Sequence, residues 1–250
     1  MAKYFIDTEF IEGFHKPLFG KKRHFIDLIS IGIVAEDGRE YYAISNEWNY
    51  NDADKWVQEN VIHKLPLKLM KKESVKDFKK RCKLSPADNV VWVEGKSNKQ
   101  IAEEIIQFVN PPSGENSLNY KSWNNHLNKF RVVAAENRPI EFFGYFADYD
   151  WCLFCSLFGR MIDLPKGFPM YCKDLKQTFD YKVELEILKL NLLTIKSDYY
   201  LKKYDGYQIN KEGISSALKS KGDYPKQENE HNALVDAKWN KELYEFLNTL

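Results

Sequence analysis

Strand-like runs fill most of the first 45 residues, and they constrain the fold more than any other feature of the chain. We expect strands at Lys3–Phe10, Phe25–Ala35 and Glu40–Ser45. The last two are joined by Glu-Asp-Gly-Arg, centred on Asp37 and Gly38. An Asp-Gly pair between apolar runs is a strong β-hairpin signal, because it suits the backbone of a tight turn. The N-terminal segment is therefore expected to begin a β-sheet.

The rest of the chain alternates between helical and strand-like patterns. A further strand is expected around Phe142, and helices are expected near Asp52–Val61, Asn98–Phe108, Trp151–Gly159 and Asp174–Thr178, with a last one after Asn232. Strands first, then strands alternating with helices, indicate a three-layer α/β arrangement. A chain of 250 residues can bury one substantial core. We expect a single domain over 1–250, with inserts near 64–98 and 180–210.

Two acids, Asp7 and Glu9, interrupt the first strand. Residues two apart on a strand point to the same face, so these carboxylates are expected to lie side by side. Acids are uncommon in strands and like charges repel, which favours a cation between them. Mg²⁺ and Mn²⁺ prefer such oxygen ligands. The alternative is an edge strand with two solvated acids.

A further acid is expected to join them from the segment Pro139–Trp151. A buried strand is expected to run as far as Phe146, and two acids, Asp148 and Asp150, follow it. Either acid can cap the apolar helix that comes next. We favour Asp150 as a metal-binding carboxylate, because it directly precedes that helix and directly follows an aromatic residue. Asp148 is then the N-cap, or a group that orients the ligands.

A histidine and an acid stand five residues apart in His-Asn-Ala-Leu-Val-Asp, near the end of the sequence. Asn232 is a suitable N-cap for an amphipathic helix, which places His231 before the helix and Asp236 in its early turns. Within one helix their side chains would point about 140° apart, so a histidine in the loop can reach a site that a helical one cannot. This suits a mobile general base beside a fixed ligand. The alternative is a surface histidine and an acid that stabilises a helix N-terminus.

In their order, these motifs resemble the three motifs of the DEDDh branch of the 3′-5′ exonuclease superfamily, which includes RNase T, oligoribonuclease and proofreading exonucleases. Longer blocks are similar to a family of small bacterial and phage 3′-5′ exoribonucleases of that branch. They read YFIDTEFIE, IDLISIGIVAEDGREYYAIS, GYFADYDWCLFCSLFGRMIDLP and HNALVDAKWN, and cover about half of the chain. The resemblance implies an RNase H-like three-layer fold, with helices flanking a central mixed β-sheet.

The resemblance also implies roles for the motif residues. It makes His231 the general base, and it makes four acids the ligands of two divalent cations, Mg²⁺ or Mn²⁺: Asp7, Glu9, Asp150 and Asp236. The implied reaction is hydrolysis of single-stranded RNA from the 3′ end to nucleoside 5′-monophosphates. One residue departs from the pattern, because many relatives have Asn four residues before the second-motif Asp, where this chain has Phe146.

Basic residues near the acids are candidates for binding phosphate groups of the substrate. The segment Gly13–His24 is expected to be a basic loop, and it contains the candidates Lys21, Lys22 and Arg23. A second basic segment, Lys64–Lys83, can also follow the phosphates, but a helical insert with a solvated charged face explains it slightly better.

Three further residues are candidates for substrate contacts. Phe10 can offer a ring on which a base stacks, although most aromatic residues of the chain are expected in the core. Asp174 can orient a ligand or the substrate, and a helix cap is the more economical explanation. Asp148 stands beside the favoured ligand and is kept as a third candidate.

The composition fits a soluble cytoplasmic enzyme without a membrane partner. The net charge of +1 does not indicate a nucleic-acid-binding protein, so the local distribution of charge matters more. The sequence has no apolar run of about 18 residues or more, and its first strand begins too early for a signal peptide. Four cysteines fit a reducing compartment, and Cys152 and Cys155 of a Cys-x-x-Cys are expected to be buried free thiols.

Single-stranded nucleic acid is the expected partner. The resemblance favours RNA over DNA, and it is the sole basis for that choice, because no motif shows a contact to the 2′-hydroxyl. Three alternatives stay open: a 3′-5′ exodeoxyribonuclease on single-stranded DNA, a catalytically decayed nucleic-acid-binding protein, and a metal-dependent phosphatase. The presence of all the motif residues argues against decay. The sequence does not indicate the oligomeric state, and a homodimer stays open.

Overall fold

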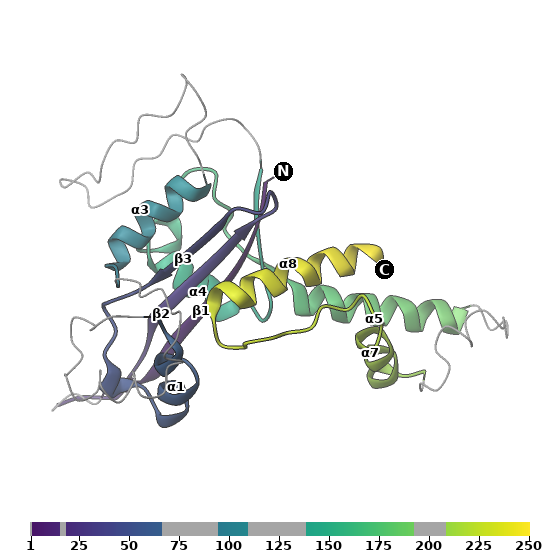
Figure 1. The fold of residues 1–250 in the computed structure, drawn as a ribbon, viewed down its shortest axis with the longest axis horizontal. Helices are drawn as coiled ribbons and strands as arrows, with labels where there is room; N and C mark the ends of the chain where they lie inside the picture. Colours follow the sequence, from purple (N-terminus) through teal and green to yellow (C-terminus); the bar gives the residue numbers. More distant parts are fainter. Residues whose placement is uncertain (1, 16–18, 67–94, 110–138, 193–208) are drawn as a thin grey trace, which may run out of the picture.

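The structure is a computed structural model, which describes residues 2–15, 19–66, 95–109, 139–192 and 209–250. Within this part of the chain, one mixed sheet has the strand order β3-β2-β1-β4-β5 (Figure 1). The strands are β1 (Ala2–His15), β2 (Arg23–Ala35), β3 (Glu40–Ile44), β4 (Ile140–Gly144) and β5 (Lys173–Asp174). β2 is antiparallel to β1 and β3, whereas β4 is parallel to β1 and β5. This sheet fits an RNase H-like fold and confirms the predicted fold class.

The turn between β2 and β3 is the one that the sequence predicts. Gly38 has a φ of 89°, a conformation that costs glycine little because it has no Cβ. The Gly38 amide donates to the Ala35 carbonyl at 3.0 Å, and the Ala35 amide donates to the Arg39 carbonyl at 2.8 Å. These bonds close the hairpin and fix the register of β2 against β3.

β1 and β2 are longer than predicted. β4 pairs with β1 only at Ala2–Phe5, and β3 pairs with β2 only at Ser30–Val34. Beyond these points, Phe10–His15 and Arg23–Leu28 pair with each other as a two-stranded ribbon. The predicted loop at Gly13–His24 is therefore wrong at its two ends, because Gly13–His15 belong to β1 and Arg23–His24 to β2, whereas residues 19–22 lie outside the strands. The reason is tertiary, because apolar residues along the ribbon pack against the helical turns that follow β3.

Helices cover both faces of the sheet (Figure 1). They are α1 (Lys55–Asn60), α3 (Asn98–Val109), α4 (Asp148–Ser156), α5 (Leu175–Leu192), α7 (Lys211–Lys219) and α8 (Ala233–Thr249), with 3-10 turns at Tyr50–Asp52, Ile62–Lys64 and Met161–Asp163. Tyr4 and Ile6 share a core with α3 and α4, whereas Phe5 shares one with α5, α7 and α8. Side chains alternate between the faces of a strand, which explains this division of β1. The predicted three layers are confirmed.

Helix α8 begins in contact with the backbone of the sheet. A Cβ at Gly32 would lie only 2.2 Å from the carbonyl oxygen of Ala233, so the start of α8 requires glycine at this position. Gly32 pairs with Asp7 across β1 and β2. Further along α8, the Asn240 side-chain amide donates to the Ile6 carbonyl at 2.8 Å. These contacts place the first turns of α8 beside the two acids of β1.

Two helical regions differ from the prediction. α5 has 18 residues rather than a single short turn, because Phe179 and Val183 are buried against α7 and α8 and stabilise its continuation. The insert predicted near 180–210 therefore begins within α5. α7 was not predicted, although the Asn210 side chain accepts a hydrogen bond from the Gly213 amide and forms its N-cap.

Two other expectations are affected by the structure. Cys155 is buried but Cys152 is exposed, so the prediction of two buried thiols is wrong for Cys152, which lies on the outer side of α4. The segment Lys64–Lys83 and the insert predicted near 64–98 lie mostly outside the described residues. Among the helices that are described, none is long and apolar enough to cross a membrane.

Candidate active site

Three carboxylates meet where β1 passes the start of α8. Asp7 and Glu9 come from β1 and Asp236 from α8, and one oxygen of each lies within 4.8 Å of the others. Asp7 and Glu9 follow Phe5 along the strand with a period of two, so they point to the face that α8 covers. The sequence-predicted pairing of the two acids is present, and α8 adds the third.

Asp150 reaches the same place from the first turn of α4. Its Oδ1 accepts hydrogen bonds from the Thr8 amide at 2.9 Å and the Thr8 hydroxyl at 2.6 Å. Phe5 is the last residue of β1 that pairs with β4, so the Thr8 amide lies beyond the end of that strand. The Asp150 carboxylate thus provides the hydrogen-bond partner that β4 no longer supplies, and its position relative to β1 is fixed.

These four acids line one cavity of about 340 Å³. The other lining residues are Thr8, Phe10, Tyr145, Phe146, Tyr149, Gln227, Glu230 and His231. The cavity opens beyond the carboxyl end of β4, where ligands commonly bind in open α/β sheets. One wall is acidic and another is aromatic, which suits a ligand that carries both a phosphate–metal unit and a flat apolar group.

The Asp236 carboxylate is held by neighbouring groups before any ligand binds. Its Oδ1 accepts a hydrogen bond from the Gln227 side chain at 2.8 Å, and its Oδ2 accepts from the amides of His231 and Asn232 at 3.0 and 3.2 Å. The Asn232 side chain caps α8 by accepting from the Leu234 and Val235 amides, as predicted. Such bonds pre-orient a carboxylate for metal binding.

His231 lies before α8 and lines the cavity, as the sequence predicts. Its backbone is left-handed, with a φ of 69°, a conformation that histidine adopts more often than most residues. The imidazole packs edge-on against the Trp56 indole of α1, with 4.8 Å between ring centroids. His231 is only half-buried, so water can reach its ring.

Burial raises the pKa values of all four acids, and repulsion from neighbouring carboxylates adds to this effect at Asp7, Glu9 and Asp150. Burial and the carboxylates of Asp150, Glu9 and Asp236 raise the pKa of Asp7 well above its ordinary value. Burial and the same kind of repulsion raise the pKa of Glu9 to about 8. Burial raises the pKa of Asp150 to about 7, although its Thr8 hydrogen bonds lower it. Burial also raises the pKa of Asp236.

The donor set fits a hard divalent cation. It consists of carboxylate oxygens, which Mg²⁺ and Mn²⁺ prefer over the thiolates and imidazoles typical of structural zinc sites. Ionised together, the acids would repel one another strongly, and a cation between them would relieve that repulsion. The three ligand atoms from Asp7, Glu9 and Asp236 are already close enough to share one ion.

The geometry distinguishes Asp150 from Asp148. Asp150 is buried and lines the cavity, whereas Asp148 is exposed and does not line it. Asp148 is also not the N-cap, because α4 begins at Asp148 itself and the capping position is Ala147, which offers no side-chain oxygen. The prediction of Asp148 as N-cap is therefore wrong, since the tight turn after β4 starts the helix one residue earlier.

Asp174 stabilises the turn between β4 and α4. Its Oδ1 accepts from the Gln177 amide at 2.9 Å at the start of α5, and its Oδ2 accepts from the Ala147 amide at 2.9 Å. It does not line the cavity. The helix-cap explanation is confirmed, and the alternative of a direct substrate contact stays a prediction.

The candidate substrate contacts divide between the cavity and the ribbon. Phe10 lines the cavity and stacks on Tyr149, with ring centroids 5.4 Å apart and planes inclined by 25°. Lys21, Lys22 and Arg23 are exposed at the tip of the ribbon and do not line the cavity. The ribbon continues the strand that carries Asp7 and Glu9, so these cations extend the site along the direction of β1.

Sequence reasoning missed several residues that line the cavity or pack beside it. Thr8 lies between the two acids on β1 and points to the opposite face of the strand, and that direction is what brings it to Asp150. Trp56 and Gln227 carry no local signal, because each reaches the site through tertiary packing. Tyr149 and Phe146 had a usable signal, since both are aromatic residues within the motif that contains Asp150.

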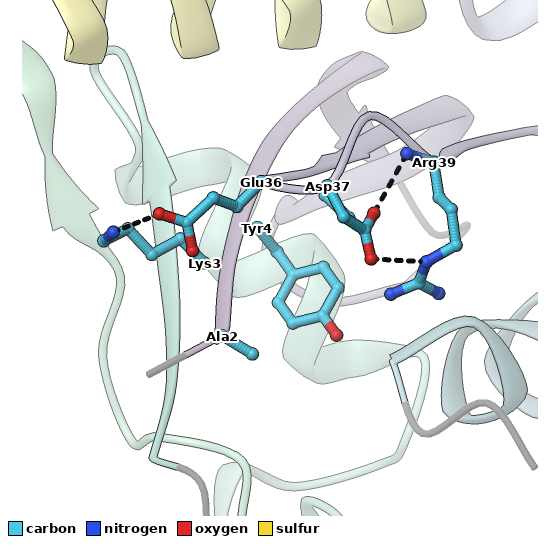
Figure 2. Close-up of a pocket in the computed structure, with 7 residues that line it drawn as sticks. Ala2, Lys3, Tyr4, Glu36, Asp37 and Arg39 are labelled. Carbon is cyan, nitrogen blue, oxygen red and sulfur yellow. Dashed lines mark hydrogen bonds and ion pairs between the residues drawn. The ribbon is translucent and has the colours of Figure 1, made fainter. Parts of the chain in front are cut away.

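A second cavity of about 220 Å³ lies at the start of β1 (Figure 2). Its charged residues neutralise one another: Lys3 pairs with Glu36, and Arg39 pairs with Asp37 at 2.8 Å. A further hydrogen bond joins the Arg39 guanidinium to the Phe108 carbonyl at 2.6 Å. This arrangement resembles a structural ion-pair network rather than a set of groups left for a ligand.

Comparison with known proteins agrees with the motifs and the fold. The family model of the 3′-5′ exoribonuclease Rv2179c-like domain matches residues 2–247. Two relatives from Mycobacterium tuberculosis are the 3′-5′ exoribonuclease MT2234.1 of strain CDC 1551 / Oshkosh and the 3′-5′ exoribonuclease Rv2179c of strain ATCC 25618 / H37Rv. Each is 30% identical over 178 residues, which cover 71% of this chain and 74% of the relative. The chain therefore belongs to the Rv2179c-like 3′-5′ exoribonuclease domain family.

Proposed function

We propose that this protein is a 3′-5′ exoribonuclease that hydrolyses single-stranded RNA from its 3′ end to nucleoside 5′-monophosphates. One observation carries the proposal: oxygens of Asp7, Glu9 and Asp236 lie within 4.8 Å of one another, in a cavity that Asp150 and His231 also line. The family and its named relatives support RNA as the substrate. In this proposal, these four acids and His231 act as the five residues of a DEDDh nuclease.

The four acids hold two divalent cations, Mg²⁺ or Mn²⁺, in this proposal. When bound, the cations supply charge stabilisation for the attacking and leaving oxygens of the scissile phosphodiester. His231 accepts a proton from the attacking water, which adds to phosphorus as the bond to the 3′ oxygen breaks. The water oxygen remains on the departing 5′-monophosphate, and the 3′ oxygen of the shortened RNA takes up a proton from solvent to become a 3′-hydroxyl.

The chain's own groups prepare this step. Thr8 orients Asp150, and the Gln227 side chain and two backbone amides orient Asp236. The half-buried position of His231 beside Trp56 leaves its ring in contact with the cavity and with solvent. Lys21, Lys22 and Arg23 on the ribbon bind phosphates upstream of the 3′ end, and Phe10 contacts a terminal base. The cytoplasmic location and the homodimer stay predictions.

The test is a time course with 5′-labelled single-stranded RNA and the matching DNA, in Mg²⁺ or Mn²⁺. Asp150→Asn is compared with Asp148→Asn, which changes the same functional group two residues away but outside the cavity. We expect a ladder that shortens from the 3′ end of RNA, is lost with Asp150→Asn or EDTA, and survives Asp148→Asn. Faster loss of DNA would instead indicate an exodeoxyribonuclease. Tight binding without cleavage would indicate a nucleic-acid-binding protein, and release of inorganic phosphate a phosphatase.

A further inference from the structure

Phe146, two residues after the end of β4, combines a strained backbone with an exposed apolar side chain. Its φ is 55°, in the left-handed region that disfavours a large side chain. Its side chain is 64% exposed, and it lines the cavity that contains the four acids. Neither feature stabilises the folded protein, and strain of this kind is concentrated at functional sites.

The backbone around Phe146 is fixed by its neighbours rather than by the phenylalanine ring. The Ala147 amide donates to Asp174 at 2.9 Å, and the Asp148 amide donates to the Phe146 carbonyl at 2.9 Å. Gly144 allows close packing in the turn, since a Cβ there would lie 2.9 Å from the Ala147 Cβ. The turn would therefore keep its shape with another residue at position 146, and one that tolerates a positive φ would relieve the strain.

The surroundings of the Phe146 ring suit a nucleotide. The ring meets Tyr145 edge-on, with centroids 4.8 Å apart, and the ammonium of Lys176 lies 5.8 Å from its centroid. The stacked pair of Phe10 and Tyr149 lines the same cavity. Lys176 is already paired with Asp180 at 2.5 Å, so the aromatic faces and the acids beside them carry the argument. They match a base next to a scissile phosphate.

We propose that Phe146 is a specificity-determining residue: its ring stacks on the base of one of the two nucleotides that flank the scissile phosphate. This inference rests on the proposed function and deepens it. Stacking accepts every base, because each has a π-face, so the contact selects single-stranded nucleic acid without selecting sequence. The left-handed backbone, which the neighbours of Phe146 fix, presents the ring to the cavity.

The test compares wild type with Phe146→Asn, Phe146→Trp and Tyr171→Asn, the last being a change at an exposed aromatic residue outside the cavity. We expect Phe146→Asn to raise KM for single-stranded RNA about tenfold, within the range that loss of one base–aromatic contact produces. Its kcat stays within about twofold and its melting temperature is at least that of wild type, because strain is removed. Phe146→Trp and Tyr171→Asn keep the wild-type KM.

A substrate with an abasic residue identifies the contacted base. The KM penalty of Phe146→Asn should vanish on RNA that lacks the stacked base at the last or the penultimate position, because the variant then has no contact to lose. An unchanged KM for Phe146→Asn on ordinary RNA overturns the inference. So does a fall in both melting temperature and kcat, which would make Phe146 a packing residue. If wild type itself fails to shorten RNA, the proposed function is wrong. That outcome differs from failure of the inference about Phe146, in which wild type shortens RNA normally.

Discussion

Thr8 donates two hydrogen bonds to a single oxygen of Asp150, from its backbone amide at 2.9 Å and from its hydroxyl at 2.6 Å. This contact joins the middle of β1 to the first turn of α4. It fixes the distance between the acids of the first strand and the acid that follows β4. In the proposed function, the other oxygen of Asp150 would bind the metal.

We therefore expect Thr8→Val to impair catalysis without unfolding the protein. Valine matches the shape of threonine and keeps the hydrogen bond from the backbone amide to Asp150. It lacks the hydroxyl that donates the second hydrogen bond. Loss of a group that orients a metal ligand typically costs about 10-fold to 100-fold in activity or metal affinity. The measurement is kcat together with the Mn²⁺ dissociation constant. Thr8→Ser should restore most of both, and wild-type kinetics in Thr8→Val would show that the hydroxyl does not position Asp150.

Gly32→Ala should separate α8 from β2. Its Cβ would lie 2.2 Å from the Ala233 carbonyl oxygen, so the start of α8 must shift and carry Asp236 with it. Overpacking of this kind costs about 1 to 3 kcal/mol in the free energy of unfolding. Urea unfolding and nuclease rate are measured beside Gly222→Ala, where an added Cβ meets nothing within 4 Å. Equal activity in the two variants would mean that close docking of α8 is not needed.

The metal-free protein should become less stable as pH rises. Unfolded Asp and Glu titrate near about pH 4, whereas in the folded protein the pKa of Asp150 is about 7 and that of Glu9 about 8. Between these values the folded state binds more protons than the unfolded state, so the free energy of unfolding falls with rising pH. Urea unfolding in EDTA at about pH 5 and about pH 8 measures the loss.

Asp7→Asn provides a control for the pH dependence of stability, because it removes one negative charge from the cluster of four acids. We expect it to stabilise the metal-free protein at high pH, where its neighbours are ionised. Added Mg²⁺ should stabilise wild type most at high pH, since the ligands must be deprotonated to bind it. A stability that rises with pH in EDTA would contradict the burial and repulsion described for these acids.

His231→Ala should reduce turnover by a factor on the order of 10² to 10⁴, the usual contribution of a general base. Metal binding should change little, because Asp236 keeps its Gln227 contact and its backbone hydrogen bonds. Single-turnover rates and Mn²⁺ titration separate these two effects. Partial rescue by added imidazole would support proton transfer, whereas full activity of the variant at neutral pH would exclude His231 as the base.

The ribbon cations should control the salt dependence of RNA binding. For single-stranded nucleic acid, a plot of log affinity against log salt concentration becomes less steep by about 0.7 for each phosphate contact removed. Replacing Lys21, Lys22 and Arg23 with Gln should therefore lower the slope by about 2 if each contacts a phosphate. Binding is measured in an Asp150→Asn background to prevent cleavage. A control replaces Lys166, Lys219 and Lys221 with Gln, and an equal change of slope there would show that the ribbon has no special role.

Local rules were enough to predict part of the structure. The period-two spacing of Asp7 and Glu9, the Asp-Gly turn of the hairpin, and the Asn232 cap each depend on a few neighbouring residues. Other features depend on distant contacts and were missed. α5 continues because α7 and α8 bury its apolar face, and the ribbon extends because later helical turns cover it. Gln227 and Trp56 reach the site only after the chain has folded.

The docking of α8 also determines when the active site forms during folding. The hydrogen bond from Asn240 to the Ile6 carbonyl joins residues 234 positions apart in the sequence, and the Asp7–Asp236 contact beside it closes a loop of similar length. Non-local contacts form late, because the entropy of closing long loops must be overcome first. We therefore expect a partly folded chain to have no complete metal site. Recovery of nuclease activity during refolding would then follow the slowest folding step, later than the appearance of helical structure.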